Sequence, residues 1–291
     1  MIYVIIKHSK KYKEGVSMDA KEKRKLHRQK MKEEGKYHNN KKKPKKKNSI
    51  FSTIVLIVAI CVFCFSAFQL YQIFSSYKKG NDEYDKIKNL AISVEKTEKG
   101  EEKFKVDFNK LWDINPDTIG WIRFEEPSRI NYPVVHSHNN KEYLTKLFGT
   151  GKNTYGTLFV DKDNSGDFQD KNTIIYGHRM KSGSMFGQLE KYMDESFYKE
   201  HPYFYIYTPD GKESKYQVIS AAVVKDTSRT YTKTFQNDEE FMDYIDYVRS
   251  ISNYQTDAEV TKDSHIVSLS TCTIDSNEDR FVLQAVKISE R

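Results

Sequence analysis

The stretch HIVSLSTCTIDSNEDRFVLQAVKI, residues 265–288, contains two runs rich in β-branched and aromatic residues, 265–270 and 280–288. Two such runs joined by a short polar link are typical of neighbouring β-strands. Cys272 follows the first run by two residues and is expected to end its strand, and Arg280 begins the second run after a seven-residue link. If the two strands pair as a hairpin, the thiol and the guanidinium lie at the same rim of a sheet.

The same composition recurs upstream. Six further runs predict strands: IGWIRF (119–124), YPVV (132–135), GTLFV (156–160), NTIIY (172–176), YFYIYT (203–208) and KYQVISAAVV (215–224). The turn signal PDGK at 209–212 predicts a hairpin between the last two of them. About eight strands with few helices predict a mainly β protein, either a closed barrel or a sandwich.

Apolar residues at helical spacing predict several helices. One pattern, over 81–96, comes from Tyr84, Ile87, Ala91 and Val94, and the following 98–103 is expected to be a loop. A helical turn is expected at Phe108, Leu111 and Trp112. Two helices interrupt the strands, one marked by Phe186, Leu189, Met193 and Phe197, the other by Phe241, Tyr244, Ile245, Val248 and Ile251. Asn237 and Glu240 are spaced like a capping box for the second.

The charge of the chain is divided unevenly. Residues 1–48 carry 18 Lys and Arg against 5 Asp and Glu, whereas the remaining residues carry 30 against 36. The basic tail has no apolar period and is expected to be disordered. The mildly acidic body argues against nucleic acid as a partner, because phosphate binding needs a positive face.

No charged residue lies between Lys47 and Lys78. About 20 apolar residues suffice to span a bilayer, and this run is too long for the apolar region of a cleaved signal peptide. Residues 49–74 are therefore expected to form a transmembrane signal-anchor helix. The flanking KKKPKKK (41–47) indicates that residues 1–48 are a cytoplasmic tail and that the body lies outside, as in a single-pass type II membrane protein.

Cys272 has no cysteine partner in the body, because Cys61 and Cys64 lie within the apolar run. A lone cysteine is often a small buried hydrophobe. At a sheet rim beside Arg280, however, a thiolate or an oxyanion would be stabilised, which favours a nucleophile. A nucleophilic cysteine needs an acid/base partner, usually His. Of the five histidines in the body, His178 alone directly follows a predicted strand through one glycine.

Three functions remain open from the residues alone. The first is a cysteine enzyme built on Cys272, His178 and Arg280. The second is a papain-like cysteine hydrolase, which the order of His before Cys in the chain disfavours. The third is a tethered extracellular binding module in which Cys272 is merely structural.

Several motifs together resemble the class B sortases, cysteine transpeptidases of Gram-positive bacteria. They are LSTC with its following Arg280, NTIIYGHRM (172–180), MFGQL (185–189), DINPDTIGWIRF (113–124) and YPVV (132–135). The resemblance implies a closed eight-stranded β-barrel with N-terminal helices and a helix before the last two strands. It also implies a catalytic domain at 106–291, Cys272 as nucleophile, His178 as acid/base and Arg280 as stabiliser of the oxyanion or substrate. The segment 75–105, which contains the helical pattern over 81–96, is expected to be a helical stalk or linker.

The same resemblance implies a reaction and its partners. The enzyme would cleave a sorting signal of the type Asn/Ser-Pro-x-Thr-Asn/Gly after Thr, through a thioester, on surface proteins. It would then join the new carboxyl group to an amine of a peptidoglycan precursor or a pilin at the cell wall. Six residues would contact the peptide: Asn140, Leu144, Thr227, Tyr231, Ser270 and Thr271.

No metal and no cofactor are expected. His136 and His138 lack a third ligand nearby in the sequence. DKDNSGD (161–167) resembles the start of a calcium loop, but the twelfth position is Asn172 instead of the bidentate Glu that such loops need. A polar turn between strands is the better interpretation of this segment.

Overall fold

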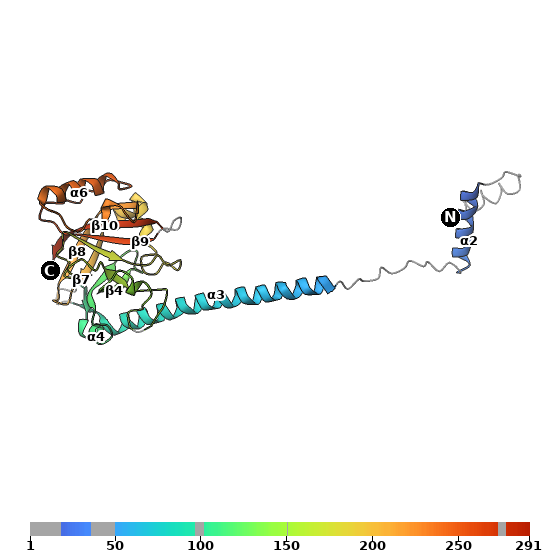
Figure 1. Cartoon of the computed structure of the whole chain (residues 1–291), viewed down its shortest axis with the longest axis horizontal. Coiled ribbons are helices and arrows are strands. Elements are labelled where there is room, and N and C mark those ends of the chain that lie inside the picture. Colours follow the sequence, from blue (N-terminus) through green and yellow to red (C-terminus); the bar gives the residue numbers. More distant parts are fainter. Residues whose placement is uncertain (1–18, 36–49, 97–101, 150, 273–277) are drawn as a thin grey trace. The chain divides into compact units, whose positions relative to one another are not determined.

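The computed structural model describes residues 19–35, 50–96, 102–149, 151–272 and 278–291, and for Glu102 and Cys272 it describes the backbone alone. Eight strands close into one barrel in the order β10-β8-β7-β3-β4-β5-β6-β9. Five of them, β4, β7, β8, β9 and β10, are labelled in Figure 1. The eight strands are β3 (Thr118–Phe124), β4 (Asn131–His136), β5 (Leu158–Val160), β6 (Asn172–Tyr176), β7 (Tyr203–Tyr207), β8 (Glu213–Lys225), β9 (Ile266–Cys272) and β10 (Asp279–Glu290). All eight predicted strands are confirmed, and the sandwich alternative is wrong.

The barrel is filled by side chains from every strand. On strand β3, for example, Trp121 and Ile122 are fully buried. Gly120 in the same strand leaves room for the Phe168 ring. The one polar atom of the Trp121 ring is satisfied because its Nε1 donates to Asn131 Oδ1 at 2.6 Å. Burial of each large apolar side chain contributes roughly 1.5–3 kcal/mol, so this core holds the rim residues in place.

Helix α6 (Asp238–Ser250) precedes the last two strands, as expected. Its apolar face, with Phe241, Tyr244, Ile245 and Val248, is buried against residues of β8, β9 and β10. The Asn237 side chain caps the helix by accepting from the Glu240 amide at 2.9 Å. The Glu240 carboxylate accepts from the Gln236 amide, one residue earlier than a capping box would have it.

The N-terminal part of the body differs from the prediction. Helix α3 (Ile50–Ala91) is continuous, so the predicted helix over 81–96 ends at Ala91. Strand β1 (Ile92–Lys96) follows and pairs antiparallel with β2 (Glu102–Val106), where the expected loop at 98–103 was wrong for its last two residues. The pairing places Ile92 opposite Val106 and Val94 opposite Phe104, and such cross-strand apolar pairs stabilise a hairpin. The segment 75–105 is therefore partly strand.

The basic tail also contains a helix. Helix α2 (Ala20–Glu33) buries none of its residues, and the prediction of disorder was wrong for this segment. Its residues are mostly strong helix formers, and the Asp19 side chain caps it by accepting from the Glu22 amide at 3.1 Å. The rest of the tail lies outside the described residues.

The remaining short helices connect the strands. The helical pattern at Phe186–Phe197 is split in two, because Asp194 accepts from the Ser196 amide and starts a new helix there. These elements are α4 (Phe108–Trp112), η1 (Glu142–Leu144), η2 (Leu189–Met193), α5 (Glu195–Glu200) and η3 (Arg229–Tyr231). The helical turn expected at Phe108 is confirmed as α4.

Among the described residues, α3 is the one helix long and apolar enough to cross a membrane. Its N-terminal half exposes large apolar side chains such as Phe63 and Phe68. Its C-terminal turns are different, because Tyr84, Ile87 and Ala91 are buried in the core of the body. One helix thus combines a possible membrane anchor with a packed element of the catalytic body.

Candidate active site

The strand that precedes His178 and the strand that ends at Cys272 are parallel neighbours in the barrel. Strand β6 pairs in parallel with β9, with Tyr176 opposite Ser270, and the Gly177 amide donates to the Ser270 carbonyl at 3.1 Å. Parallel neighbours end at the same edge of a sheet. His178, just after β6, and Cys272, the last residue of β9, therefore belong to the same end of the barrel.

The third residue is placed by the hairpin of β9 and β10. Arg280 and Cys272 are directly opposed in the antiparallel ladder, which confirms the expected pairing of the two strands. The Arg280 guanidinium donates to the Asp279 carbonyl at 3.1 Å and lies 3.6 Å from the Asp226 carboxylate. Its side chain is 23% exposed, so it faces a site that solvent and a ligand can both reach.

A cavity of about 400 Å³ opens at this edge of the barrel. Seven of the nine site residues expected from the sequence line this cavity: Asn140, Leu144, His178, Tyr231, Ser270, Thr271 and Arg280. Cys272 follows Thr271 directly at the end of β9, so its backbone lies next to the cavity as well. The volume is within the range of small-ligand and peptide sites.

Two glycines shape the surroundings of His178, and one of them, Gly156, makes room for its ring. A Cβ on Gly177 would lie 2.4 Å from Leu158 Cδ2, and a Cβ on Gly156 would lie 2.9 Å from the His178 ring. Gly156 also has a φ of +67°, which other residues adopt only with strain. The imidazole is thus packed closely against a backbone that only glycine permits.

The tautomer of His178 is set by a backbone carbonyl. The ring Nε2 lies 2.6 Å from the Leu144 carbonyl oxygen. A carbonyl can only accept, so Nε2 carries the proton and the lone pair of the neutral ring is on Nδ1. Leu144 therefore contributes to the site through its backbone, in addition to lining the cavity with its side chain.

The opposite wall of the cavity is a chain of aromatic and hydroxyl groups. The Tyr231 hydroxyl and Ser270 Oγ are hydrogen bonded at 2.8 Å, and the Tyr231 ring stacks on Tyr176 with centroids 6.4 Å apart. Thr271 is 2% exposed, and its Oγ1 has no hydrogen-bond partner among the described residues.

Thr227 is placed differently from the other expected residues. It is exposed in the segment between β8 and η3, and it does not line the cavity. Its neighbour Asp226 does, as do Tyr176 and Phe159, which sequence reasoning missed. The position of Tyr176 at the end of the run NTIIY, two residues before His178, was a signal that could have identified it.

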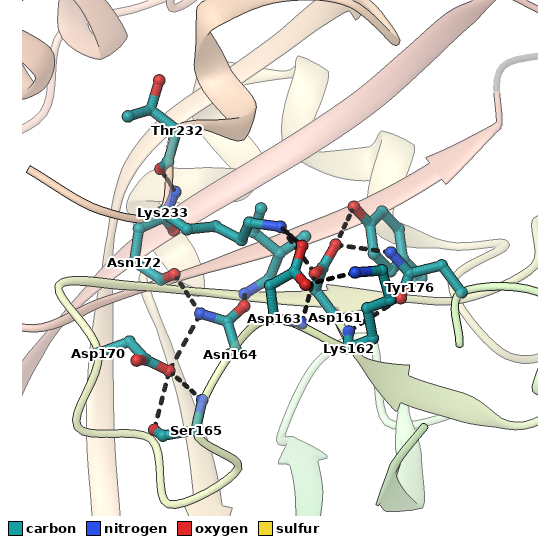
Figure 2. Close-up of polar contacts among 12 residues, drawn as sticks. Asp161, Lys162, Asp163, Asn164, Ser165, Asp170, Asn172, Tyr176, Thr232 and Lys233 are labelled. Atoms are coloured by element: carbon teal, nitrogen blue, oxygen red, sulfur yellow. Dashed lines mark hydrogen bonds and ion pairs between the residues drawn. The ribbon is translucent and has the colours of Figure 1, made fainter. Parts of the chain in front are cut away.

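The segment that resembles a calcium loop is a network of internal hydrogen bonds (Figure 2). Both Asp161 and Asp163 accept from Lys233 Nζ, at 2.8 and 2.9 Å. The Asn164 amide donates to the Asp161 carbonyl at 3.0 Å, as in a polar turn. Within the part of the chain that the structure describes, no three His, Cys, Asp or Glu side chains gather as a metal site.

A closed mixed barrel with a cysteine, a histidine and an arginine at one edge defines a thiol-dependent enzyme of the sortase fold. The family profile described as Sortase domain matches residues 122–288, more than half of the chain. The chain belongs to the sortase family. Two relatives of this chain are both sortase B, which identifies the class within the family. The chain is a sortase B-type cysteine transpeptidase.

The similarity extends over most of the body. Sortase B of Listeria monocytogenes is 34% identical over 188 residues, which cover 63% of this chain and 75% of the relative. Sortase B of Staphylococcus aureus is 31% identical over 224 residues, which cover 76% and 89%. The crystal structure of sortase B from Bacillus anthracis in complex with AAEK1 is 31% identical, has a TM-score of 0.65, and is matched over 74% of this chain and 99% of that chain.

These findings decide between the functions that the residues left open. A papain-like hydrolase and a binding module with a structural cysteine are both excluded, because the family is one of cysteine transpeptidases.

Proposed function

We propose that Cys272 is the nucleophile, His178 the acid/base and Arg280 the stabiliser of the oxyanion. The Cys272 thiolate attacks the carbonyl carbon of Thr in the sorting signal. The C–N bond then breaks, the leaving amine takes a proton from the His178 imidazolium, and a thioester remains. An acceptor amine attacks the thioester, gives its proton to His178 and releases the thiolate as the new amide forms.

One observation carries this proposal. Cys272 ends β9, directly opposite Arg280 on β10, and β9 lies beside the parallel strand β6, which leads to His178. The Nε2 proton is held by the Leu144 carbonyl, so Nδ1 of His178 is the nitrogen that exchanges protons. Positioned acid/base groups contribute roughly 10²–10⁴-fold to rates, and a donor to an oxyanion contributes about 2.7–4 kcal/mol of barrier.

The cavity at the barrel edge is the proposed groove for the sorting signal, of the type Asn/Ser-Pro-x-Thr-Asn/Gly. Asn140, Leu144, Tyr231, Ser270 and Thr271 form its walls. Among the solved structures similar to this chain are a Staphylococcus aureus sortase B–substrate complex and a sortase B complexed with triglycine. A peptide substrate and an amine acceptor at the cell wall, on a peptidoglycan precursor or a pilin, suit the same groove here. Thr227 is proposed only as a residue of the groove entrance, because it adjoins Asp226.

The location of the enzyme follows from its helix α3. We infer that residues 49–74 cross the membrane, that residues 1–48 are cytoplasmic, and that residues 106–291 act outside the cell, joined by the segment 75–105. The apolar N-terminal half of α3 and the basic residues that precede it support this arrangement.

Trapping the thioester tests the assignment of the nucleophile. The protein is incubated with the peptide Asn-Pro-Gln-Thr-Asn and analysed by intact-mass spectrometry, with and without triglycine as acceptor. We expect an adduct on the fragment that contains Cys272, its disappearance when triglycine is added, and no adduct with Cys272→Ala. An adduct on any other residue, or cleavage by Cys272→Ala, would contradict the proposal.

A further inference from the structure

A buried carboxylate stands behind the wall of the cavity, at Asp161. It follows strand β5, and its side chain is only 3% exposed. One oxygen accepts from Lys233 Nζ at 2.8 Å and from the Asp163 amide at 3.0 Å. The other accepts from Asn140 Nδ2 and from the Tyr176 hydroxyl, each at 2.9 Å. A buried charge is tolerated only when it is paired and hydrogen bonded, and this one has four donors.

The two donors to the second oxygen belong to the cavity wall. Both polar atoms of the Asn140 side chain are hydrogen bonded, because Nδ2 donates to Asp161 and Oδ1 accepts from the Lys162 amide at 2.9 Å. Tyr176 stacks on Tyr231, whose hydroxyl is hydrogen bonded to Ser270 on β9, the strand that ends at Cys272. The orientation of both walls therefore depends on where the Asp161 carboxylate lies.

Lys233 supplies the countercharge from a distant part of the chain. It follows η3, is 22% exposed on its side chain, and reaches Asp161 and Asp163 together (Figure 2). Burial alone would lower the pKa of Lys233, but the hydrogen bonds that its ammonium donates to the two carboxylates raise the pKa above its ordinary value. Lys233 thus remains charged at neutral pH and holds the η3 segment against the loop after β5.

We propose that the Asp161–Lys233 ion pair is a positioning device for peptide recognition, which fixes Asn140 and Tyr176 in the walls of the groove. Neither residue of the pair lines the cavity, so both act through other side chains. Loss of the pair weakens binding of the sorting peptide and leaves the chemistry of the Cys272 thiol intact. The inference rests on the proposed function in one respect, that the cavity takes the peptide.

Three substitutions in the full chain, kept in detergent micelles, test it. Lys233→Met removes the countercharge, and Asp161→Asn removes the charge and one acceptor oxygen while leaving no buried ion unpaired. Lys162→Met is the matched control, because Lys162 also pairs with Asp163 but its side chain makes no bond to Asp161. Melting curves identify any variant that does not fold, and Asp161→Asn then replaces Lys233→Met.

Three readouts separate positioning from general damage. The first is the dissociation constant of Asn-Pro-Gln-Thr-Asn on a Cys272→Ala background. The second is the rate of Cys272 alkylation by iodoacetamide, read on the Cys272 peptide by mass spectrometry. The third is hydrogen exchange of the Lys162 amide, which reports the bond to Asn140 without any substrate.

For Lys233→Met and Asp161→Asn we expect peptide affinity to fall about 10-fold and alkylation to change less than about 2-fold, since small misplacements of binding groups have effects of this order. Exchange of the Lys162 amide should accelerate in both, and Lys162→Met should resemble wild type in peptide affinity and in alkylation rate. Unchanged affinity, or alkylation that falls in parallel with affinity, would overturn the proposal. If the wild-type groove does not bind this peptide, the proposed substrate is wrong, and the exchange rate alone decides: acceleration supports the positioning device and no change overturns it.

Discussion

At the residue scale, substitutions of Arg280 can separate the effect of its positive charge from the effect of its forked hydrogen-bond donors. If its forked donors hold an oxyanion, Arg280→Lys should lose about 10²–10³-fold in kcat even though the charge is kept, because an ammonium cannot reproduce the fork. If the charge alone lowered the pKa of the thiol, Lys would retain most of the rate. The measurement is kcat/KM against pH for wild type, Arg280→Lys and Arg280→Ala, with circular dichroism as the control for folding. A near-normal Arg280→Ala enzyme would remove this residue from the mechanism.

The hydrogen bonds of Asp161 lead to a second prediction at this scale, about how protein stability depends on pH in the acid range. Burial alone would raise the pKa of its carboxyl, but the bonds from Lys233, Asp163 and Tyr176 lower it below its ordinary value. A group with a lowered folded-state pKa adds stability that is present above its ordinary pKa of about 3.9 and is lost as the pH falls through the lowered value. Asp161→Asn should therefore reduce the free energy of unfolding at pH 7 and flatten its fall below about pH 4.

Denaturant titrations at several pH values between 7 and 3 measure this effect. Asp263→Asn is the control, since its carboxylate is 80% exposed. If wild type and Asp161→Asn lose stability in parallel over the acid range, the ionised Asp161 is not a source of stability.

At the element scale, the turn after β6 depends on Gly177. A Cβ there would meet Leu158 at 2.4 Å and Phe186 at 2.6 Å, both buried, so neither neighbour can move aside freely. Overpacking of this kind costs about 1–3 kcal/mol, and it would displace His178. We expect Gly177→Ala to lower the melting temperature and kcat/KM together. Gly149→Ala is the matched control, because its nearest neighbours lie at 3.4 Å, and a fully active Gly177→Ala would show that the turn is not constrained.

Helix α3 makes a second prediction at this scale. Tyr84 is 3% exposed, and its hydroxyl donates at 2.6 Å to the carbonyl of Gly156, the glycine that makes room for the His178 ring. Tyr84→Ala removes a large aromatic side chain from the core and should destabilise the body by about 3–5 kcal/mol. Leu90→Ala, on the same helix but 45% exposed, should have little effect. Equal melting temperatures for the two variants would mean that these turns of α3 do not belong to the catalytic fold.

At the scale of the whole molecule, the prediction concerns sidedness. If α3 crosses the membrane with the basic tail inside, protease added to intact protoplasts should digest the body and leave an epitope at residues 1–35 protected. After lysis the tail should be digested as well, which serves as the control. A body that survives protease in intact protoplasts would reverse the proposed orientation, and with it the action at the cell wall.

The sequence by itself determined the strands, helix α6 and the pairing of Cys272 with Arg280. These depend on composition, on local period and on a short link between neighbouring strands, which a single stretch of chain displays. Helix α2 and the β1–β2 hairpin were missed, since the first has no apolar face and the second is too short to outweigh a helical pattern that runs into it.

Only the tertiary structure decided which distant segments meet. The parallel pairing of β6 with β9 brings the end that carries His178 beside Cys272, and no local period records that pairing. The ion pair of Asp161 with Lys233 is likewise absent from any local pattern. The segment 161–167 resembles a calcium loop because carboxylates at alternate positions are all that the sequence displays there. A carboxylate's role depends on the charge that faces it, and that charge arrives from another part of the chain only when the barrel closes.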